Sequence, residues 1–331
     1  MYFPCFSRDY YNDAISKREI YMPDGDKMTM TYGSVYVYGM MVLSTIHQLK
    51  GKFPSADGYR EIQQTFVMPG GEAANGAVVL RNLGVPVMLD GCFLGDLTAE
   101  PLRKYLNDRN VDCSLLRHQA GFPGWRDIVF CDGDTRTVFG WFVDYLFGGK
   151  KLWSEPNEKA IKSAKCVSLD PFFGSESEEV ARLCLKHHKN YVTIDSRWDT
   201  PIAKMARVIV CSQEFLDREY PGAEYEALLK QYQANCAGLV IFTFGSRPIL
   251  FGSAGSTIGT FLPYPITVVD TLGAGDTFRA GVVYGVLSGW PDKELVRFAS
   301  ACAAVSCLRF PSVYHPPSLT EITELTNSRP D

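Results

Sequence analysis

Short apolar segments alternate with amphipathic ones along most of this chain, and that alternation limits the folds it can adopt. From Ser34 onward the apolar runs are bounded by turn residues and rich in Val and Ile, as strands buried on both faces are. Strands that alternate with helices form a mainly parallel sheet sandwiched by helices. The sequence therefore predicts a doubly wound α/β fold.

The expected main-sheet strands span residues 35–38, 85–89, 166–169, 191–194, 207–210 and 239–242. Two of the expected helices end at a glycine, the usual residue just beyond a helix: 73–83 before Gly84, and 275–288 before Gly289.

Two regions break the alternation and predict a small β-lid. Residues 58–67 and 126–142 are strand-like, and the second contains Asp132-Gly133, a strong hairpin signal between β-rich runs. We expect residues 1–33 to form an N-terminal extension and the approach to the first strand. Residues 34–331 would form one domain with lid strands from about 45–68 and 117–145.

Composition excludes several classes of protein. The 331 residues are 46% apolar and 21% charged, which is ordinary for a globular protein. A net charge of −4 without a run of Lys or Arg argues against a nucleic-acid partner. No apolar stretch reaches the roughly 18 residues of a membrane span, and no secretory signal is recognisable, so a cytoplasmic protein is expected. The ten cysteines lack zinc-binding spacing and are expected to be reduced core residues.

The most informative motif is D-T-L-G-A-G-D (270–276), which follows an apolar run and opens an expected helix. The small residues Gly273, Ala274 and Gly275 let backbone N–H groups converge, and the helix N-terminus adds partial positive charge, so an anion hole is predicted. Asp276 in the first turn can take a proton from a hydroxyl that attacks a phosphorus atom held there. Alternatively, Asp276 only caps the helix.

A second motif, M-P-G-G-E-A-A-N (68–75), places two glycines before a helix. Gly70 and Gly71 permit close approach of the backbone to a ligand, and Asn75 offers a donor and an acceptor to a polyol. A tight turn followed by a helix start is the alternative. Asp170 follows a strand at the sheet edge where α/β proteins bind ligands, so it is a candidate substrate residue or else a turn aspartate.

Together with G-C-F-L-G-D (91–96), these motifs resemble the ribokinase-like, or PfkB, family of carbohydrate and nucleoside kinases, in order and in spacing. The segments D-S-R-W-D (195–199) and V-F-G (138–140) are similar to the fructosamine and fructoselysine kinases of that family. The resemblance implies ATP-dependent phosphorylation of a terminal hydroxyl of a sugar or sugar derivative, with a ketose-like acceptor favoured. A nucleoside kinase and a non-catalytic binding protein on the same scaffold are the alternatives.

The resemblance also implies a role for individual residues. Asp276 would be the general base, with ATP held at the anion hole of Gly273, Ala274 and Gly275. Gly70, Gly71 and Asn75 would contact the sugar. Thr243 and Gly245 would contact the nucleotide, and Glu214 would contribute indirectly to binding Mg²⁺.

The motifs depart from the family pattern at several positions. Ser44 stands where the family usually has an Asp that binds substrate hydroxyls, and Cys211 stands in place of the Asn of the N-x-x-E element that ends at Glu214. Arg279 could pair with Asp276 or with a phosphate, and Arg247 either reaches a nucleotide phosphate or lies in solvent. Pairing of lid edges in a homodimer and a requirement for a monovalent cation stay open.

Overall fold

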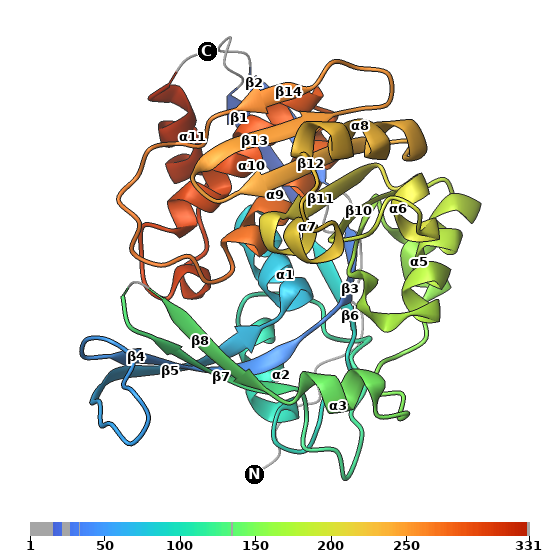
Figure 1. The fold of residues 1–331 in the computed structure, drawn as a ribbon. Helices are drawn as coiled ribbons and strands as arrows, with labels where there is room; N and C mark the ends of the chain where they lie inside the picture. The colour runs from blue at the N-terminus through green and yellow to red at the C-terminus, as the bar shows by residue number, and fades with distance from the viewer. Residues whose placement is uncertain (1–15, 22–26, 33, 134, 330–331) are drawn as a thin grey trace.

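The computed structural model describes residues 16–21, 27–32, 34–133 and 135–329. An eight-stranded sheet lies at the centre of the domain (Figure 1). Six neighbouring strands are parallel, and two more continue the sheet antiparallel at one edge. In spatial order the strands are β14 (Gly259–Phe261), β13 (Arg247–Gly252), β12 (Leu239–Phe244), β11 (Val208–Ser212), β10 (Asn190–Ile194), β9 (Cys166–Leu169), β3 (Val35–Gly39) and β6 (Val87–Gly91).

Helices cover both faces of this sheet (Figure 1). One face carries α1 (Glu72–Asn82) and α9 (Ala274–Ser288), with α10 (Asp292–Ser306) against α9 and α11 (Leu319–Asn327) against α10. The other face carries α4 (Glu158–Ser163), α5 (Ser175–Lys186), α6 (Pro201–Met205), α7 (Gln213–Glu219) and α8 (Tyr225–Asn235). The predicted doubly wound α/β fold is confirmed, and the six predicted strands are present with ends shifted by at most two residues.

The edge strands β13 and β14 were not predicted. Arg247 and Pro248 open β13, whereas the sequence analysis left Arg247 either reaching a nucleotide phosphate or lying in solvent. Proline is tolerated in this edge region. The observed strand adds an antiparallel edge to the mainly parallel sheet that the sequence predicts.

A separate four-stranded sheet forms the lid, at the lower left of Figure 1. Ile46, Met68 and Val129 of its inner face form a small apolar cluster with Val313 of the segment 312–314. The short helices α2 (Ala99–Asn107) and α3 (Phe142–Phe147) lie nearby. The lid strands, in spatial order, are β5 (Ile62–Gly70), β4 (Val42–Leu49), β7 (Arg126–Cys131) and β8 (Arg136–Gly140).

The part of the expected extension that the structure describes is an antiparallel hairpin of β1 (Ser16–Tyr21) and β2 (Lys27–Tyr32). It forms a sheet of its own, so residues 27–32 pair with β1 instead of only leading into the main sheet. Residues 1–15, 22–26 and 33 of the expected extension lie outside the described residues.

Candidate active site

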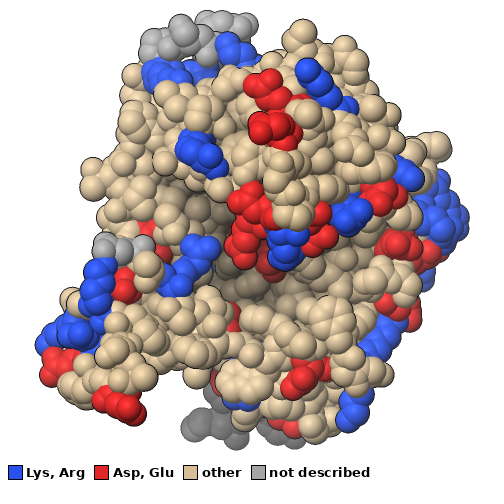
Figure 2. Space-filling model, in the orientation of Figure 1, with Lys and Arg blue, Asp and Glu red and all other residues tan. Residues whose placement is uncertain are grey.

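A cavity of about 470 Å³ lies between the lid and the main domain, and Figure 2 shows the surface hollowed there. On the face shown, acidic and basic side chains are interspersed. Lid strands β4, β7 and β8, helix α3 and the amino ends of α1 and α9 all contribute to its walls. Its polar lining residues include Ser44, Glu72, Asn75, Asp127, Arg136, Thr271 and Asp276.

The amino end of α9 forms one wall, with Gly273 as its N-cap residue. Gly275 and Asp276 belong to the first turn, where backbone N–H groups have no helical carbonyl to bind. The N–H of Ala274 instead donates to the carbonyl of Thr271 at 3.2 Å, and Ala274 does not line the cavity. The expected anion hole is thus reduced to the backbone around Gly273, Gly275 and Asp276.

Asp276 is half-buried and lines the cavity, which favours a role in chemistry over a purely capping one. Its Oδ2 accepts a hydrogen bond from Nδ2 of Asn75 at 2.8 Å. Burial raises the pKa of Asp276, while the charge of Arg279 and the Asn75 hydrogen bond partly offset that rise. A carboxylate with a raised pKa is suited to accept a proton near neutral pH.

The second motif forms the adjoining wall. Gly71 precedes α1 with a φ of 84°, and a Cβ at this position would lie 2.7 Å from the carbonyl oxygen of Met40. A Cβ on Gly70 would lie 2.1 Å from Oγ of Ser44. The paired glycines therefore let β4, β5 and α1 meet closely, and this brings Asn75 and Ser44 to the same cavity.

Behind the cavity, Arg279 pairs with Asp170, and each is only 1% exposed. Asp170 also accepts the N–H of Met40 at 2.7 Å, and Arg279 donates to the carbonyl of Glu72 at 2.5 Å. Arg279 therefore pairs with Asp170 instead of Asp276, and it does not line the cavity. Asp170 does not line the cavity, so its expected contact with the substrate is not supported. The buried pair instead joins β9, α9 and the start of α1.

Glu72 lines the cavity, although the sequence analysis assigned it no role. Burial and the nearby carboxylates of Asp170 and Asp276 raise its pKa to about 8. A neutral carboxyl can donate a hydrogen bond as well as accept one. The sequence contained a signal for this role, because Glu72 directly follows a glycine pair that was already assigned to a ligand site.

Two lid residues were also missed. Arg136 on β8 lines the cavity and donates from Nη1 to Oγ1 of Thr271 at 3.0 Å, which links the lid to the D-T-L-G-A-G-D loop. Asp127 on β7 also lines the cavity, and it is paired with Ser44 of the neighbouring strand β4. The two-residue period of a strand puts Asp127 on the same face as Val129 of the lid's apolar cluster, so the alternation in 126–131 could have shown its face but not its neighbouring strand.

The expected nucleotide residues lie at the ends of neighbouring strands and do not line this cavity. Thr243 is on β12, and Gly245 follows it with a φ of 65°. Glu214 is exposed in the first turn of α7, directly after β11. Because β11 and β12 are parallel, these positions share one sheet edge. Arg247 is exposed at the start of β13, 5.2 Å from the ring centre of Phe244.

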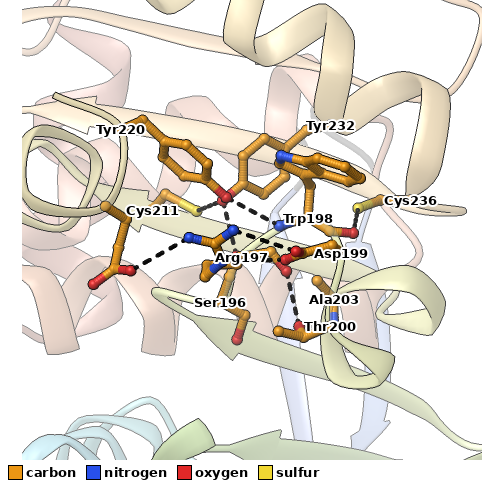
Figure 3. Close-up of polar contacts among 11 residues, drawn as sticks. Ser196, Arg197, Trp198, Asp199, Thr200, Ala203, Cys211, Tyr220, Tyr232 and Cys236 are labelled. Carbon is orange, nitrogen blue, oxygen red and sulfur yellow. Dashed lines mark hydrogen bonds and ion pairs between the residues drawn. The ribbon is translucent and has the colours of Figure 1, made fainter. Parts of the chain in front are cut away.

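The segment 195–199, similar to fructosamine kinases, forms a polar network after β10 and does not line the cavity (Figure 3). Arg197 lies 5.5 Å from the ring centre of Tyr220 and pairs with Asp199 through Nε at 3.2 Å. The hydroxyl of Tyr232 donates to the carbonyl of Ser196 at 2.9 Å. These contacts stabilise a turn that lies outside the cavity.

Other features can be stated for the described residues only. They contain no cluster of three or more His, Cys, Asp or Glu arranged to bind a metal. None of their helices is both long and apolar enough to cross a bilayer. Nine cysteines fall within them, and all nine are buried with free thiols, in keeping with the core role expected.

Comparison with known proteins gives consistent matches. The model of the pfkB family carbohydrate kinases matches residues 34–316. The 5-dehydro-2-deoxygluconokinase of Geobacillus kaustophilus is 23% identical over 276 residues, which cover 75% of this chain and 82% of that one. Fructoselysine 6-kinase of Shigella flexneri is 27% identical over 254 residues, which cover 75% of this chain and 92% of that one.

Among solved structures, a putative ribokinase from Agrobacterium tumefaciens superposes with a TM-score of 0.81 at 20% identity. The match covers 90% of this chain and 98% of that one. At this identity the likeness establishes a shared fold.

Proposed function

The chain belongs to the PfkB family of carbohydrate kinases and is an ATP-dependent sugar kinase, and on this premise we propose that Asp276 is its general base. The observation that carries the proposal is the position of the Asp276 carboxylate. It lines the cavity at the amino end of α9, and its Oδ2 lies 2.8 Å from Nδ2 of Asn75. The acceptor is a sugar or sugar derivative with a terminal hydroxyl, and a ketose-like acceptor is favoured.

The chemistry follows from that position. Asp276 accepts the proton of the acceptor hydroxyl as the oxygen attacks the γ-phosphorus of ATP. A new O–P bond forms, the bond between the γ-phosphorus and the bridging oxygen breaks, and ADP leaves with the electron pair. The free backbone N–H groups at the start of α9 stabilise the negative charge that develops on the transferred group.

Arg136 adds a positive charge from the lid side. Its guanidinium bonds Thr271 in the loop that leads into α9, so it stands where the transferred group would be held. Preorganised charge of this kind acts most strongly where water is excluded, and lid strands form part of the cavity wall.

ATP and Mg²⁺ complete the proposed site. Thr243, Gly245 and the exposed Glu214 offer nucleotide and indirect Mg²⁺ contacts along one sheet edge. Because the described residues lack a dedicated metal cluster, Mg²⁺ would be held chiefly by the nucleotide phosphates, whose charge it neutralises. A requirement for a monovalent cation and the formation of a homodimer through the lid stay predictions.

The proposal is tested by measuring ADP release with Mg²⁺ and ATP against ketoses, aldoses, fructosamines, sugar acids and nucleosides. Turnover with sugars but not with nucleosides is expected. Turnover confined to nucleosides would favour the alternative of a nucleoside kinase. If all acceptors fail although ATP and a sugar both bind, the protein is a non-catalytic binder.

A further inference from the structure

The lid places a carboxylate in the acceptor cavity that the proposed mechanism does not use. Asp127 on β7 is paired with Ser44 in the parallel register of β7 and β4, and both residues line the cavity. Paired residues on adjacent strands project from the same face of a sheet. Asp127 and Ser44 therefore form one polar pair on the inner face of the lid, between apolar neighbours such as Ile46 and Val129.

The hydrogen bonding of Asp127 is incomplete. The Ser44 hydroxyl lies beside its carboxylate and lowers its pKa, whereas its Oδ1 is buried and has no hydrogen-bond partner among the described residues. Buried polar atoms nearly always find a partner. An unsatisfied oxygen in the wall of a cavity therefore indicates that a donor on a ligand completes it.

The charge state of Asp127 suits that role. Burial raises its pKa to about 6, so the group remains mostly ionised at neutral pH. An ionised carboxylate only accepts hydrogen bonds, and those it accepts from hydroxyl or ammonium groups are stronger than bonds between neutral groups. The group is thus suited to hydroxyls or an amine of the acceptor.

The other charges in the cavity restrict the acceptor further. Glu72, Asp127 and Asp276 are the acidic lining residues, and Arg136 is the one basic residue of that lining within the described chain. Arg136 bonds Thr271 in the loop before α9, so the positive charge lies at the phosphoryl end. An acceptor carboxylate beside Asp127 would meet a like charge, which disfavours its binding.

Given that the chain is a sugar kinase, as proposed above, we propose that Asp127 is a specificity-determining residue positioned by Ser44. Its carboxylate binds hydroxyl or amine donors of the acceptor. The acceptor is therefore a polyhydroxyl compound that carries no carboxylate close to Asp127.

The test measures acceptor binding directly by calorimetry and turnover by ADP release. The probes are D-fructose, an N-alkyl 1-amino-1-deoxyfructose, D-ribose and D-gluconate. Asp127→Asn removes the charge at nearly constant shape, and Asp144→Asn removes an exposed carboxylate of α3 that does not line the cavity. We expect D127N to weaken binding of the preferred polyol about 10- to 100-fold, the range for a lost charged hydrogen bond. Its acceptor KM should rise far more than its kcat falls, and D144N should match wild type.

A double-mutant cycle tests the part assigned to Ser44. Ser44→Ala should weaken polyol binding in the wild-type background, because Asp127 loses the hydroxyl that orients it. In the D127N background the same change should have a smaller effect, since the charged partner is already gone. Equal effects in both backgrounds would show that Ser44 does not act through Asp127.

The outcomes separate this inference from the proposed function. Wild-type affinity in folded D127N, or tighter binding of D-gluconate than of every neutral or aminated sugar, would overturn the inference. Wild-type protein that binds none of the polyols would overturn it as well. Polyol binding that D127N weakens, without turnover of any acceptor by wild type, would support the role of Asp127 and contradict the kinase mechanism.

Discussion

Nδ2 of Asn75 lies 2.8 Å from Oδ2 of Asp276, although 201 positions separate the two residues in the chain. One stands near the start of α1 and the other in the first turn of α9, and the two helices pack together on the same face of the main sheet. The hydrogen bond fixes the orientation of the Asp276 carboxylate and lowers its pKa against the effect of burial. Asn75 is therefore a positioning residue for the base as well as a candidate sugar contact.

Asn75→Ala should lower kcat by about tenfold or more, because the base loses the group that orients it. The variant should also move the acid limb of the kcat/KM profile to higher pH, since removal of this donor raises the pKa of Asp276 further. Measurement of the rate from pH 5 to pH 9 checks both effects. A lower kcat with an unmoved acid limb would indicate that Asn75 acts on the sugar alone.

Acidic pH should weaken activity through two carboxylates. Asp276 must be ionised to accept a proton, and Asp127, with a pKa of about 6, must be ionised to bind acceptor hydroxyls. Both pKa values are raised, so kcat/KM should fall as the pH drops through about 6 and below, well above the range of an ordinary Asp. Glu72 shares the cavity and stays protonated over this range, because its pKa is about 8.

The D127N variant separates the two contributions. Its kcat/KM profile should retain the acid limb of Asp276 and lose the one centred near pH 6. A profile identical in shape to that of wild type would assign the whole acid limb to Asp276.

The buried pair of Arg279 and Asp170 should matter mainly for stability. Arg279→Met leaves the Asp170 carboxylate buried without its charged partner, which is expected to lower the free energy of unfolding by roughly 3–5 kcal/mol. Urea unfolding measures this loss. Arg182→Met, at an exposed pair with Glu179, is the matched control and should change stability little. A loss no larger in R279M than in R182M would contradict the assignment.

Arg136→Gln should reduce kcat by at least about tenfold, because a positive charge at the phosphoryl end is removed. Arg60→Gln, an exposed Arg between β4 and β5, is the control and should leave kcat near the wild-type value. Steady-state ADP release at saturating acceptor and ATP distinguishes the two variants. If R136Q raised only the acceptor KM, Arg136 would be an acceptor contact instead.

Much of the fold could be predicted because the buried parallel strands appear in the sequence as continuous apolar runs. The apolar run at 166–169 predicted β9 with its observed ends, and Gly289 correctly predicted where α9 ends. Strands β13 and β14 were not predicted. Edge strands tolerate residues that mark loops elsewhere, such as Pro248 in β13.

The site was predictable mainly where it lies in glycine-rich motifs, and Ser44 on β4 is the exception. Residues around Gly71 and Gly273 have backbone requirements that are visible in the sequence. Asp127, by contrast, acquires its role from the pairing of β7 with β4, and local sequence does not fix which strand of the lid lies beside another. Asp170 was given a substrate contact because its position at a strand end suggested one, but its carboxylate is taken up by Arg279.

Detection of the phosphorylated acceptor by ³¹P NMR, with wild type and Asp276→Asn run side by side, tests the central claim most directly. The account predicts a sugar phosphate and ADP in equal amounts with wild type, and a rate lower by about 10²- to 10⁴-fold in D276N, the usual contribution of a general base. The folded variant should still bind sugar and ATP. Product formation by D276N at the wild-type rate would contradict the role of Asp276 and, with it, the proposed mechanism.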